Sequence, residues 1–244
     1  MQQDFTGKVV IVTGASQGLG AGTSKEFARC GAKVMLVSRT LNKLEQVKQA
    51  IEALGGTAET FACDIAQEES VQGLIEKTHS CFGAVDILIN NAAYHKSVPV
   101  VETSKALWDT QIATNLTGTF LCTKAVLPDM LEREYGKVIN ISSSAAKHFF
   151  PGFGAYAASK GGIVSFTHTL SEEVKHKGIN VNAVYLGMTN TEHTQERLLE
   201  DEAVTIDLEA MLQVSDVLPV IIFLASDDSR AIMGAAIDVF GRKS

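Results

Sequence analysis

Short apolar runs alternate with longer segments in which apolar residues recur every three or four positions. The first run, Lys-Val-Val-Ile-Val-Thr at 8–13, is rich in β-branched residues and predicts a strand buried on both faces. Similar runs predict strands at 34–37, 57–62, 85–89, 137–142, 179–184 and 236–239, and the helical patterns fall at 19–30, 41–54, 71–82, 104–131, 156–176 and 216–226. This alternation predicts an α/β fold, a doubly wound parallel sheet of about seven strands with helices on both faces.

No linker, repeat or low-complexity segment interrupts the pattern, so residues 1–244 are predicted to form one domain. Pro219 falls near the beginning of the last predicted helix, where a proline is tolerated only in the first turn.

Composition narrows the classes of partner. Hydrophobic residues make up 45% of the chain and charged residues 20%, as in a globular protein. The net charge of −7, the isoelectric point of about 5.4 and the lack of a basic run argue against nucleic acid or an anionic membrane as a partner. The amino end shows no signal-peptide pattern, and the apolar run 217–225 is too short to span a membrane, so a cytoplasmic location is expected.

Metal ligands and disulfides are not indicated either. The four cysteines are widely separated and do not group with the six histidines at metal-ligand spacing. Buried free thiols are the simplest interpretation, and no metal site is predicted.

A glycine-rich turn joins the first predicted strand to the first helix. Gly14, Gly18 and Gly20 leave out Cβ atoms where a backbone must turn tightly, approach a pyrophosphate and pack a helix on its strand. The free N–H groups at the helix start would then face the phosphates. A glycine triplet alone is a weak signal, but this position in the strand–helix unit favours dinucleotide binding.

The end of the second predicted strand bears on the choice of dinucleotide. Enzymes that prefer NAD usually carry an acid here, whereas this chain has Ser38 followed by Arg39. The Arg39 guanidinium is a planar fork suited to a 2′-phosphate, so NADP(H) is favoured over NAD(H). The alternative is that Arg39 only ends a strand on a solvated surface.

Tyr156 and Lys160 lie four residues apart in a predicted helix and therefore share one face. A neighbouring ammonium lowers the pKa of a phenol and suits it to move protons near neutral pH. Ser143, thirteen residues before Tyr156 and just after a predicted strand, can donate to the same carbonyl oxygen. Alone, the pair would be better explained as an ordinary exposed helix face.

These motifs together resemble the short-chain dehydrogenase/reductase family, whose signatures are Tyr-x-x-x-Lys preceded by Ser and the turn Thr-Gly-x-x-x-Gly-x-Gly. The resemblance extends over essentially the whole chain and implies a Rossmann-like fold. It implies hydride transfer between a nicotinamide and a carbonyl or secondary alcohol. The implied catalytic residues are Asn115, Ser143, Tyr156 and Lys160, with Asn115 holding a water that links Lys160 to solvent.

The same resemblance, with the glycine turn and the Ser38–Arg39 argument, indicates the residues that contact the cofactor. They are Gly14, Ser16, Gln17, Gly18, Leu19, Gly20, Ser38, Arg39, Asp64, Ile65, Asn91, Ala92, Tyr156, Lys160, Gly187, Thr189 and Thr191. Asp64 is equally compatible with a helix cap. The chain departs from the family pattern at Ala93, at Leu186 and at Phe240-Gly241-Arg242.

Aromatic residues beside the motifs suggest the substrate. Tyr94, His95, Phe149, Phe150, Phe153 and Tyr185 favour an apolar pocket for a bulky or cyclic ketone, and ordinary core or a subunit contact is an equal alternative. For His95 and His148, a solvent-facing loop position competes with a hydrogen bond to substrate. A short substrate lid is expected at about 189–213, where acids predominate.

Two further functions remain open. A 3-oxoacyl-carrier-protein reductase fits the motifs, but the acidic stretch 192–209 would oppose docking of an acidic carrier. A cofactor-binding regulator without turnover is disfavoured by the intact catalytic residues. The resemblance also implies a homo-oligomer, a tetramer or dimer, joined through the helices at 104–131 and 156–176.

Overall fold

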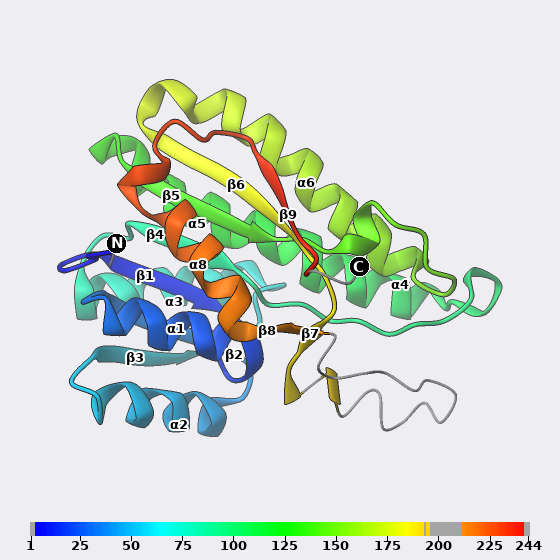
Figure 1. The fold of residues 1–244 in the computed structure, drawn as a ribbon, viewed down its shortest axis with the longest axis horizontal. Coiled ribbons are helices and arrows are strands. Elements are labelled where there is room, and N and C mark those ends of the chain that lie inside the picture. The colour runs from blue at the N-terminus through cyan, green and yellow to red at the C-terminus, as the bar shows by residue number, and fades with distance from the viewer. Residues whose placement is uncertain (1–2, 193, 196–210, 242–244) are drawn as a thin grey trace.

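The computed structural model describes residues 3–192, 194–195 and 211–241 (Figure 1). Its centre is a seven-stranded sheet in the order β3-β2-β1-β4-β5-β6-β9, in which every pairing is parallel. The strands are β1 (Val9–Thr13), β2 (Lys33–Ser38), β3 (Thr57–Ala62), β4 (Ile87–Asn90), β5 (Gly136–Ile141), β6 (Ile179–Leu186) and β9 (Ala236–Val239). The predicted doubly wound α/β fold is confirmed.

Helices cover both faces of this sheet, as Figure 1 shows. They are α1 (Gly18–Arg29), α2 (Leu41–Glu52), α3 (Glu68–Phe82), α4 (Lys105–Ile112), α5 (Gly118–Arg133), α6 (Gly154–Val174) and α8 (Val214–Ala225). Short 3₁₀ segments lie at η1 (Val100–Glu102), η3 (Ser144–Ala146), η4 (Lys175–Lys177) and η5 (Asp227–Ser229), and β7 (Thr189–Asn190) pairs with β8 (Leu212–Gln213).

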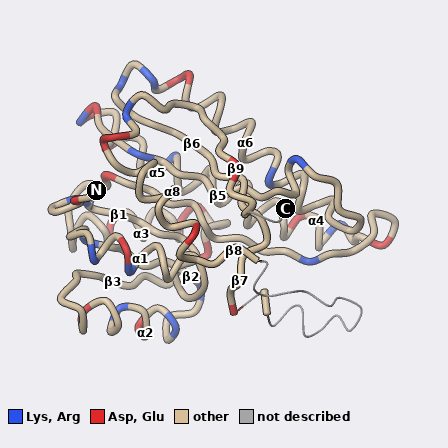
Figure 2. The backbone as a smooth tube through the Cα atoms, viewed as in Figure 1, with Lys and Arg blue, Asp and Glu red and all other residues tan. Residues whose placement is uncertain are grey.

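Alternation along the strands divides the core into two layers. Val10 and Val12 of β1 pack with residues of α1, α2 and α8, whereas Ile11 packs with residues of α3, α5 and α6. Because both faces are covered, β1 is apolar up to Thr13 and fully buried. Charged residues lie mainly on the outer helices and loops (Figure 2).

The order of strands reverses direction at β1. The chain first builds outward through β2 and β3, then returns to add β4, β5 and β6 on the other side of β1. Neighbouring connections therefore diverge between β1 and β4, and a crevice forms beyond their carboxyl ends.

Two sequence expectations need correction. The long helical region predicted at 104–131 is α4 and α5 joined by a π-helical turn, η2 (Ala113–Thr117). Pro219 is the sixth residue of α8 and not a first-turn residue, because a capping box between Gln213 and Asp216 begins the helix at Val214. The proline removes the N–H that would donate to the carbonyl of Ser215.

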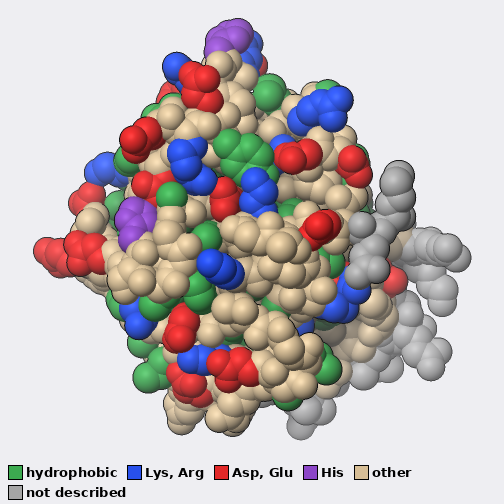
Figure 3. Space-filling view, turned by 90° about the vertical axis from the view of Figure 1, so that its left-hand side faces the viewer, with side chains coloured by type: hydrophobic (Ala, Val, Ile, Leu, Met, Phe, Trp, Pro, Cys, Tyr) green, Lys and Arg blue, Asp and Glu red, His purple; other side chains and the backbone are tan. Residues whose placement is uncertain are grey.

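The edge where the strands begin carries paired charges. Lys137 of β5 is 2% exposed, donates to Asn180 Oδ1 at 2.9 Å and lies 3.7 Å from Asp227. Arg133 and Asp86 form a second pair there, at 2.6 Å. Figure 3, which views the molecule from this side, shows basic and acidic side chains interspersed on the surface.

Candidate active site

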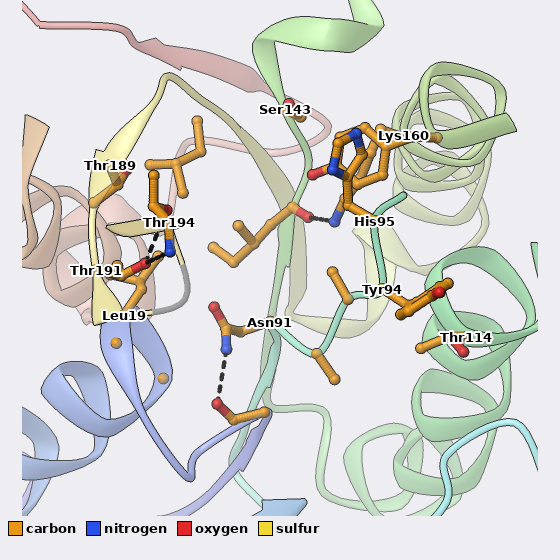
Figure 4. Close-up of a pocket in the computed structure, with 18 of the residues that line it drawn as sticks. Leu19, Asn91, Tyr94, His95, Thr114, Ser143, Lys160, Thr189, Thr191 and Thr194 are labelled. Carbon is orange, nitrogen blue, oxygen red and sulfur yellow. Dashed lines mark hydrogen bonds between the residues drawn. The ribbon is translucent and has the colours of Figure 1, made fainter. Parts of the chain in front are cut away.

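A cavity of about 1150 Å³ lies at the edge where the strands end (Figure 4). Its walls include the residues that end or follow β1, β2, β4, β5 and β6, as expected for a doubly wound sheet. Every residue predicted to contact the cofactor lines it: Gly14, Ser16, Gln17, Gly18, Leu19, Gly20, Ser38, Arg39, Asp64, Ile65, Asn91, Ala92, Tyr156, Lys160, Gly187, Thr189 and Thr191.

The turn between β1 and α1 has no room for side chains. Gly14 and Gly18 have φ angles of +68° and +53°, in the left-handed region that favours glycine. A Cβ atom on Gly20 would lie 2.1 Å from the carbonyl oxygen of Gly14, and one on Gly14 would lie 2.9 Å from Cα of Ala92. The backbone therefore forms a cradle that a diphosphate can approach closely.

The ends of β1 and β4 are tied together beside this cradle. The hydroxyl of Thr13 accepts hydrogen bonds from the backbone N–H groups of Asn91 and Ala92, both at 3.0 Å. The Asn91 amide donates in return to the carbonyl of Thr13 at 2.9 Å. The two walls of the crevice are thus held in fixed register.

The start of α1 already attracts an anion. The backbone N–H of Gly18 donates to a carboxylate oxygen of Glu192 at 3.1 Å, and the side chain of the capping residue Gln17 makes no capping bond. A carboxylate at this position stands in for a phosphate, because both satisfy the free amides and the positive end of the helix dipole. The glycine cradle and this contact show that the residues fit a dinucleotide.

The end of β2 supplies the other half of the crevice. Ser38 Oγ accepts from the N–H of Thr40 at 3.1 Å, and Lys43, in the first turn of α2, donates to Gln17 at 2.8 Å. Among the ion pairs of the described residues, neither Arg39 nor Lys43 has a carboxylate partner. Two cations therefore lie close together in sequence, at the end of β2 and the start of α2, on the wall of the cavity.

Ser143, Tyr156 and Lys160 line the opposite part of the cavity. Lys160 is 2% exposed, donates to the carbonyl of Ile141 at 2.7 Å and has its ammonium 5.8 Å from the centre of the Tyr156 ring. Burial lowers the pKa of Lys160 to about 8. An ammonium with this pKa is still mostly charged at neutral pH and can stabilise a phenolate.

Ser143 follows β5 and begins η3, where its hydroxyl accepts from the N–H of Ala145 at 3.2 Å. The next residue back, Ser142, donates to the carbonyl of Lys160 at 2.9 Å. This bond joins the end of β5 to α6, the helix that carries Tyr156, so the catalytic candidates share one rigid frame.

Comparison with known proteins identifies the family. The family model described as short chain dehydrogenase matches residues 8–202. The chain belongs to the short-chain dehydrogenase/reductase family. Members of this family are oxidoreductases that act on a carbonyl or alcohol carbon, and in this dehydrogenase/reductase the glycine cradle, Ser143, Tyr156 and Lys160 line one cavity.

Three curated relatives match over nearly their whole length. The chain is 36% identical to the 3-oxoacyl-[acyl-carrier-protein] reductase of Synechocystis (97% of each covered). It is 32% identical to FabG of Thermotoga maritima, a 3-oxoacyl-[acyl-carrier-protein] reductase (96% of this chain, 97% of the relative). It is also 32% identical to BbsD of Thauera aromatica, a subunit of (2S)-[(R)-hydroxy(phenyl)methyl]succinyl-CoA dehydrogenase (97% and 96%).

Among solved structures, an actinorhodin polyketide ketoreductase variant crystallised with NADPH superposes with a TM-score of 0.91. It is 28% identical to this chain, and the superposition covers 100% of this chain and 99% of the ketoreductase.

Asn115 lies beside the cavity of this dehydrogenase/reductase and does not line it. It is fully buried in the π-helical turn, where its amide donates to the carbonyl of Tyr94 at 3.0 Å and to Ser159 at 2.9 Å. Its side-chain oxygen accepts from the N–H of Tyr94 at 2.7 Å. Asn115 therefore fixes the loop after β4 through these two hydrogen bonds to the backbone of Tyr94.

The predicted substrate residues divide into two groups. Tyr94, His95, Phe150 and Phe153 line the cavity, but Phe149 and Tyr185 do not. Phe149 is 99% exposed in a surface loop, and the ring of Tyr185 lies under the ammonium of Lys147 at 4.2 Å. Phe149 and Phe150 are adjacent in sequence, but only Phe150 lines the cavity. The sequence alone does not show which of two adjacent aromatic side chains faces a pocket.

Several lining residues were missed from the sequence. Lys43, Met188, Thr194 and Met211 all line the cavity. Lys43 lies in the first turn of α2, four residues after Arg39. This spacing could have indicated from the sequence that the two cations lie close together. His148, for which a contact with substrate was one of two alternatives, also lines the cavity, and its ring packs against Phe240 at 5.3 Å. In the predicted lid at 189–213, residues 193 and 196–210 lie outside the described part of the chain.

The described residues contain neither a metal-binding cluster nor a membrane-spanning helix. No group of three or more His, Cys, Asp or Glu residues in this part of the chain is arranged to hold a metal ion. Within the same residues, none of the helices is both long enough and apolar enough to cross a bilayer.

Proposed function

We propose that this dehydrogenase/reductase is NADP(H)-dependent and transfers a hydride between the nicotinamide and a carbonyl or secondary alcohol carbon. The observation that carries the proposal is the presence of Ser143, Tyr156 and Lys160 on the wall of the cavity that also contains the glycine cradle. The chain is proposed to act as one catalytic domain in the cytoplasm.

The proposed mechanism assigns one task to each residue. Tyr156 gives its phenolic proton to the substrate oxygen during reduction and removes it during oxidation. Ser143 donates a hydrogen bond to the same oxygen and stabilises the charge that develops there. Lys160 lowers the pKa of Tyr156 and binds the nicotinamide ribose. The bound cofactor supplies or accepts the hydride.

Asn115 supports this set from behind, and its proposed role is to hold a water that links Lys160 to solvent. The pocket residues Gly18 and Leu19 bind the diphosphate, and Thr189 and Thr191 the nicotinamide end. Asp64 and Ile65 flank the adenine. Each of these assignments follows the family pattern at the matching position of this chain.

NADP(H) is favoured over NAD(H) by the charges at the end of β2. Arg39 and Lys43 offer two cations near Ser38, and no acid follows β2 to repel a 2′-phosphate. The ketoreductase of similar structure was crystallised with NADPH, which supports the same choice.

A bulky or cyclic ketone is the proposed substrate. Phe150 and Phe153 contribute adjoining rings, with centroids 5.4 Å apart, and His95 packs between Phe153 and Tyr156, while Tyr94 lines another part of the cavity. The names of the similar polyketide ketoreductase and of BbsD, whose substrate name includes a phenyl group, support a substrate of this size.

A 3-oxoacyl chain on a carrier protein is the second candidate. The relatives from Thermotoga and Synechocystis are reductases of that type, at 32% and 36% identity. Against it stand the acids in 192–209, which outnumber the single Arg197 and would repel an acidic carrier. A homo-oligomer, tetramer or dimer, is proposed for either function, because Trp108, Phe120 and Leu131 on α4 and α5 are about 40% exposed.

The test measures oxidation of NADPH and NADH by the purified protein over cyclic ketones, aryl ketones and a 3-oxoacyl thioester on pantetheine or carrier. The expected result is faster turnover with NADPH and with a bulky ketone. Arg39→Gln should weaken NADPH binding about 10- to 100-fold and leave NADH binding unchanged. Arg230→Gln, at the other edge of the sheet, is the matched control. A preference for NADH would overturn the cofactor proposal, and turnover of the carrier-bound thioester alone would favour the second candidate.

A further inference from the structure

A second pair of aromatic rings lines the cavity beyond the end of β9. This strand ends at Val239, and the next residue, Phe240, is part of the cavity wall. The centroid of its ring lies 5.3 Å from that of His148, with the two planes inclined at 58°. Phe240 is half-buried and belongs to the segment Phe240-Gly241-Arg242, where the chain departs from the family pattern.

The sheet fixes the backbone position of Phe240. Val239 is paired with Leu186 of β6, and its carbonyl accepts a hydrogen bond from the N–H of Gly187 at 2.8 Å. A Cβ atom on Gly187 would lie only 3.0 Å from Cα of Phe240, so the glycine permits this close approach. Gly241, with a φ angle of +86°, turns the chain directly after the ring.

An ion pair holds the loop of His148 to β9. Lys147 Nζ lies 2.6 Å from Asp238 Oδ1 and 4.2 Å from the centre of the Tyr185 ring. Because both charged side chains are partly exposed, the pair contributes little to stability. It does fix which residues of the loop and the strand are neighbours, and His148 therefore packs on Phe240.

The order of the strands places this pair and the ring of His95 on opposite sides of Ser143. Ser143 follows β5, and His95 follows β4, the neighbouring strand on one side. Phe240 follows β9, which lies beyond β6 on the other side. In Figure 4, His95 lies on one side of the strand that leads to Ser143, and Thr189, after β6, lies on the other. A carbonyl held at Ser143 would have an aromatic wall on each side.

The cavity around Phe240 is apolar. Leu186, Met188 and Met211 line it there, at the end of β6 and the start of β8. Among the described lining residues, the only carboxylate is that of Asp64, which follows β3 at the opposite edge of the sheet. Methionine side chains adapt to the shape of a neighbour, whereas a phenyl ring keeps its own. The ring of Phe240 is therefore the part of this wall with a fixed shape.

We propose that Phe240 is a specificity-determining residue: its ring, supported by His148, limits the size of the apolar substituent on the side of the carbonyl away from His95. This rests on the proposed function, because it takes the carbonyl to be held at Ser143 and Tyr156. The substrate is then a ketone with an apolar group on each side of the carbonyl carbon, and Phe240 contacts one of the two groups.

The first test is the dependence of kcat/KM on chain length for NADPH-dependent reduction of phenyl alkyl ketones, from methyl to hexyl. Phe240→Ala moves the wall back and should shift the best alkyl group to a longer one, by about two carbons. Phe240→Trp moves the wall forward and should shift the best alkyl group to a shorter one. It should also lower kcat/KM for the ketone preferred by the wild type about tenfold or more, because one methylene group in a closed apolar pocket changes specificity by about 10- to 200-fold.

Phe223→Ala is the matched control, because Phe223 is a partly exposed phenylalanine on α8 that does not line the cavity. It should leave the preferred chain length unchanged. His148→Ala removes the support of the ring and should shift the preference in the same direction as Phe240→Ala, by less. The preferred length is a ratio of rates within one preparation, so a partial loss of folded protein does not alter it. The same preferred length in wild type, Phe240→Ala and Phe240→Trp would overturn the proposal.

The second test needs no turnover. Calorimetry measures the binding of each ketone to protein saturated with NADP⁺, which cannot reduce it. Affinity in the wild type should peak at one chain length, and the peak should move with Phe240→Ala and Phe240→Trp as in the first test. A peak that moves without turnover of any ketone would support the role of Phe240 and count against the proposed function. Reduction of ketones with a binding peak that ignores both substitutions would overturn the role of Phe240 and leave the proposed function standing.

Discussion

Two lysines are buried at opposite edges of the same sheet, and their partners differ. Lys137 lies where β5 begins, and Lys160 lies on α6 beside the end of β5; each is 2% exposed. Burial lowers the pKa of both ammonium groups.

The groups around the two ammonium ions differ, and this difference separates a structural lysine from a candidate catalytic one. Lys137 bonds to Asn180 and faces the Asp227 carboxylate at 3.7 Å, which partly offsets the effect of burial. Lys160 bonds to one backbone carbonyl, and burial is the whole cause of its lowered pKa. Among the ion pairs of the described residues Lys160 has no carboxylate partner, and its ammonium lies 5.8 Å from the centre of the Tyr156 ring, close enough to stabilise the phenolate of that residue. A buried lysine whose pKa is lowered and which has no carboxylate to offset that lowering is therefore a candidate for a functional residue.

The strongest way to break this comparison is to replace each lysine by methionine. Lys160→Met should lower kcat/KM for ketone reduction about 10²- to 10⁴-fold, because Tyr156 loses the cation that supports proton transfer. Lys137→Met should change it less than about twofold, because the two sites share no partner. Steady-state rates with NADPH and the best ketone of the panel provide the measurement.

Thermal unfolding of the same two variants gives the complementary readout. Lys137→Met leaves the Asn180 oxygen buried without its donor, at a cost of about 1–3 kcal/mol of unfolding free energy. If Lys137→Met were the variant that lost activity, the distinction between the two edges would be wrong.

The pH dependence of stability sharpens the comparison further. The pKa of Lys160 is about 8 in the folded protein and 10.5 in the unfolded chain, so between these values the unfolded chain binds more protons. The contribution of Lys160 to the unfolding free energy should therefore rise with pH across this window, by about 3 kcal/mol. Denaturant unfolding of wild type and Lys160→Met from pH 7 to 10.5 isolates it. A difference between the two proteins that is independent of pH would show that burial does not perturb Lys160.

The smallest expected effect concerns the acid at the cofactor edge. The Glu192 carboxylate accepts a hydrogen bond from the backbone N–H of Gly18, and its negative charge would repel a phosphate bound at the same place. Glu192→Gln should tighten NADPH binding about two- to fivefold, the size of a helix-terminus charge effect. Titration of NADPH fluorescence measures the change, with Glu69→Gln on α3 as control. Weaker binding by Glu192→Gln would mean that the acid assists the cofactor.

Local motifs explain why the sheet and most of the cofactor contacts were predictable from sequence. The glycine turn, Ser143 and the Tyr156–Lys160 pair depend on neighbours within a turn or a strand end, and such spacing is fixed by the element itself. The contacts that were missed depend on how a loop packs. Nothing in the sequence shows that Gln111 grips Lys96, or that Phe150 turns into the cavity while Phe149 turns out.

Tyr156→Phe tests the central claim most directly, because it removes one oxygen from the proposed proton donor and leaves the ring in the stack with His95. NADPH binding and NADPH-dependent ketone reduction should be measured on the same preparations of wild type and variant. The predicted result is NADPH affinity within about threefold of wild type and a kcat lowered about 10²- to 10⁴-fold. Equal turnover by the two proteins would contradict the assignment of Tyr156, and NADPH binding without turnover by either would favour a cofactor-binding regulator.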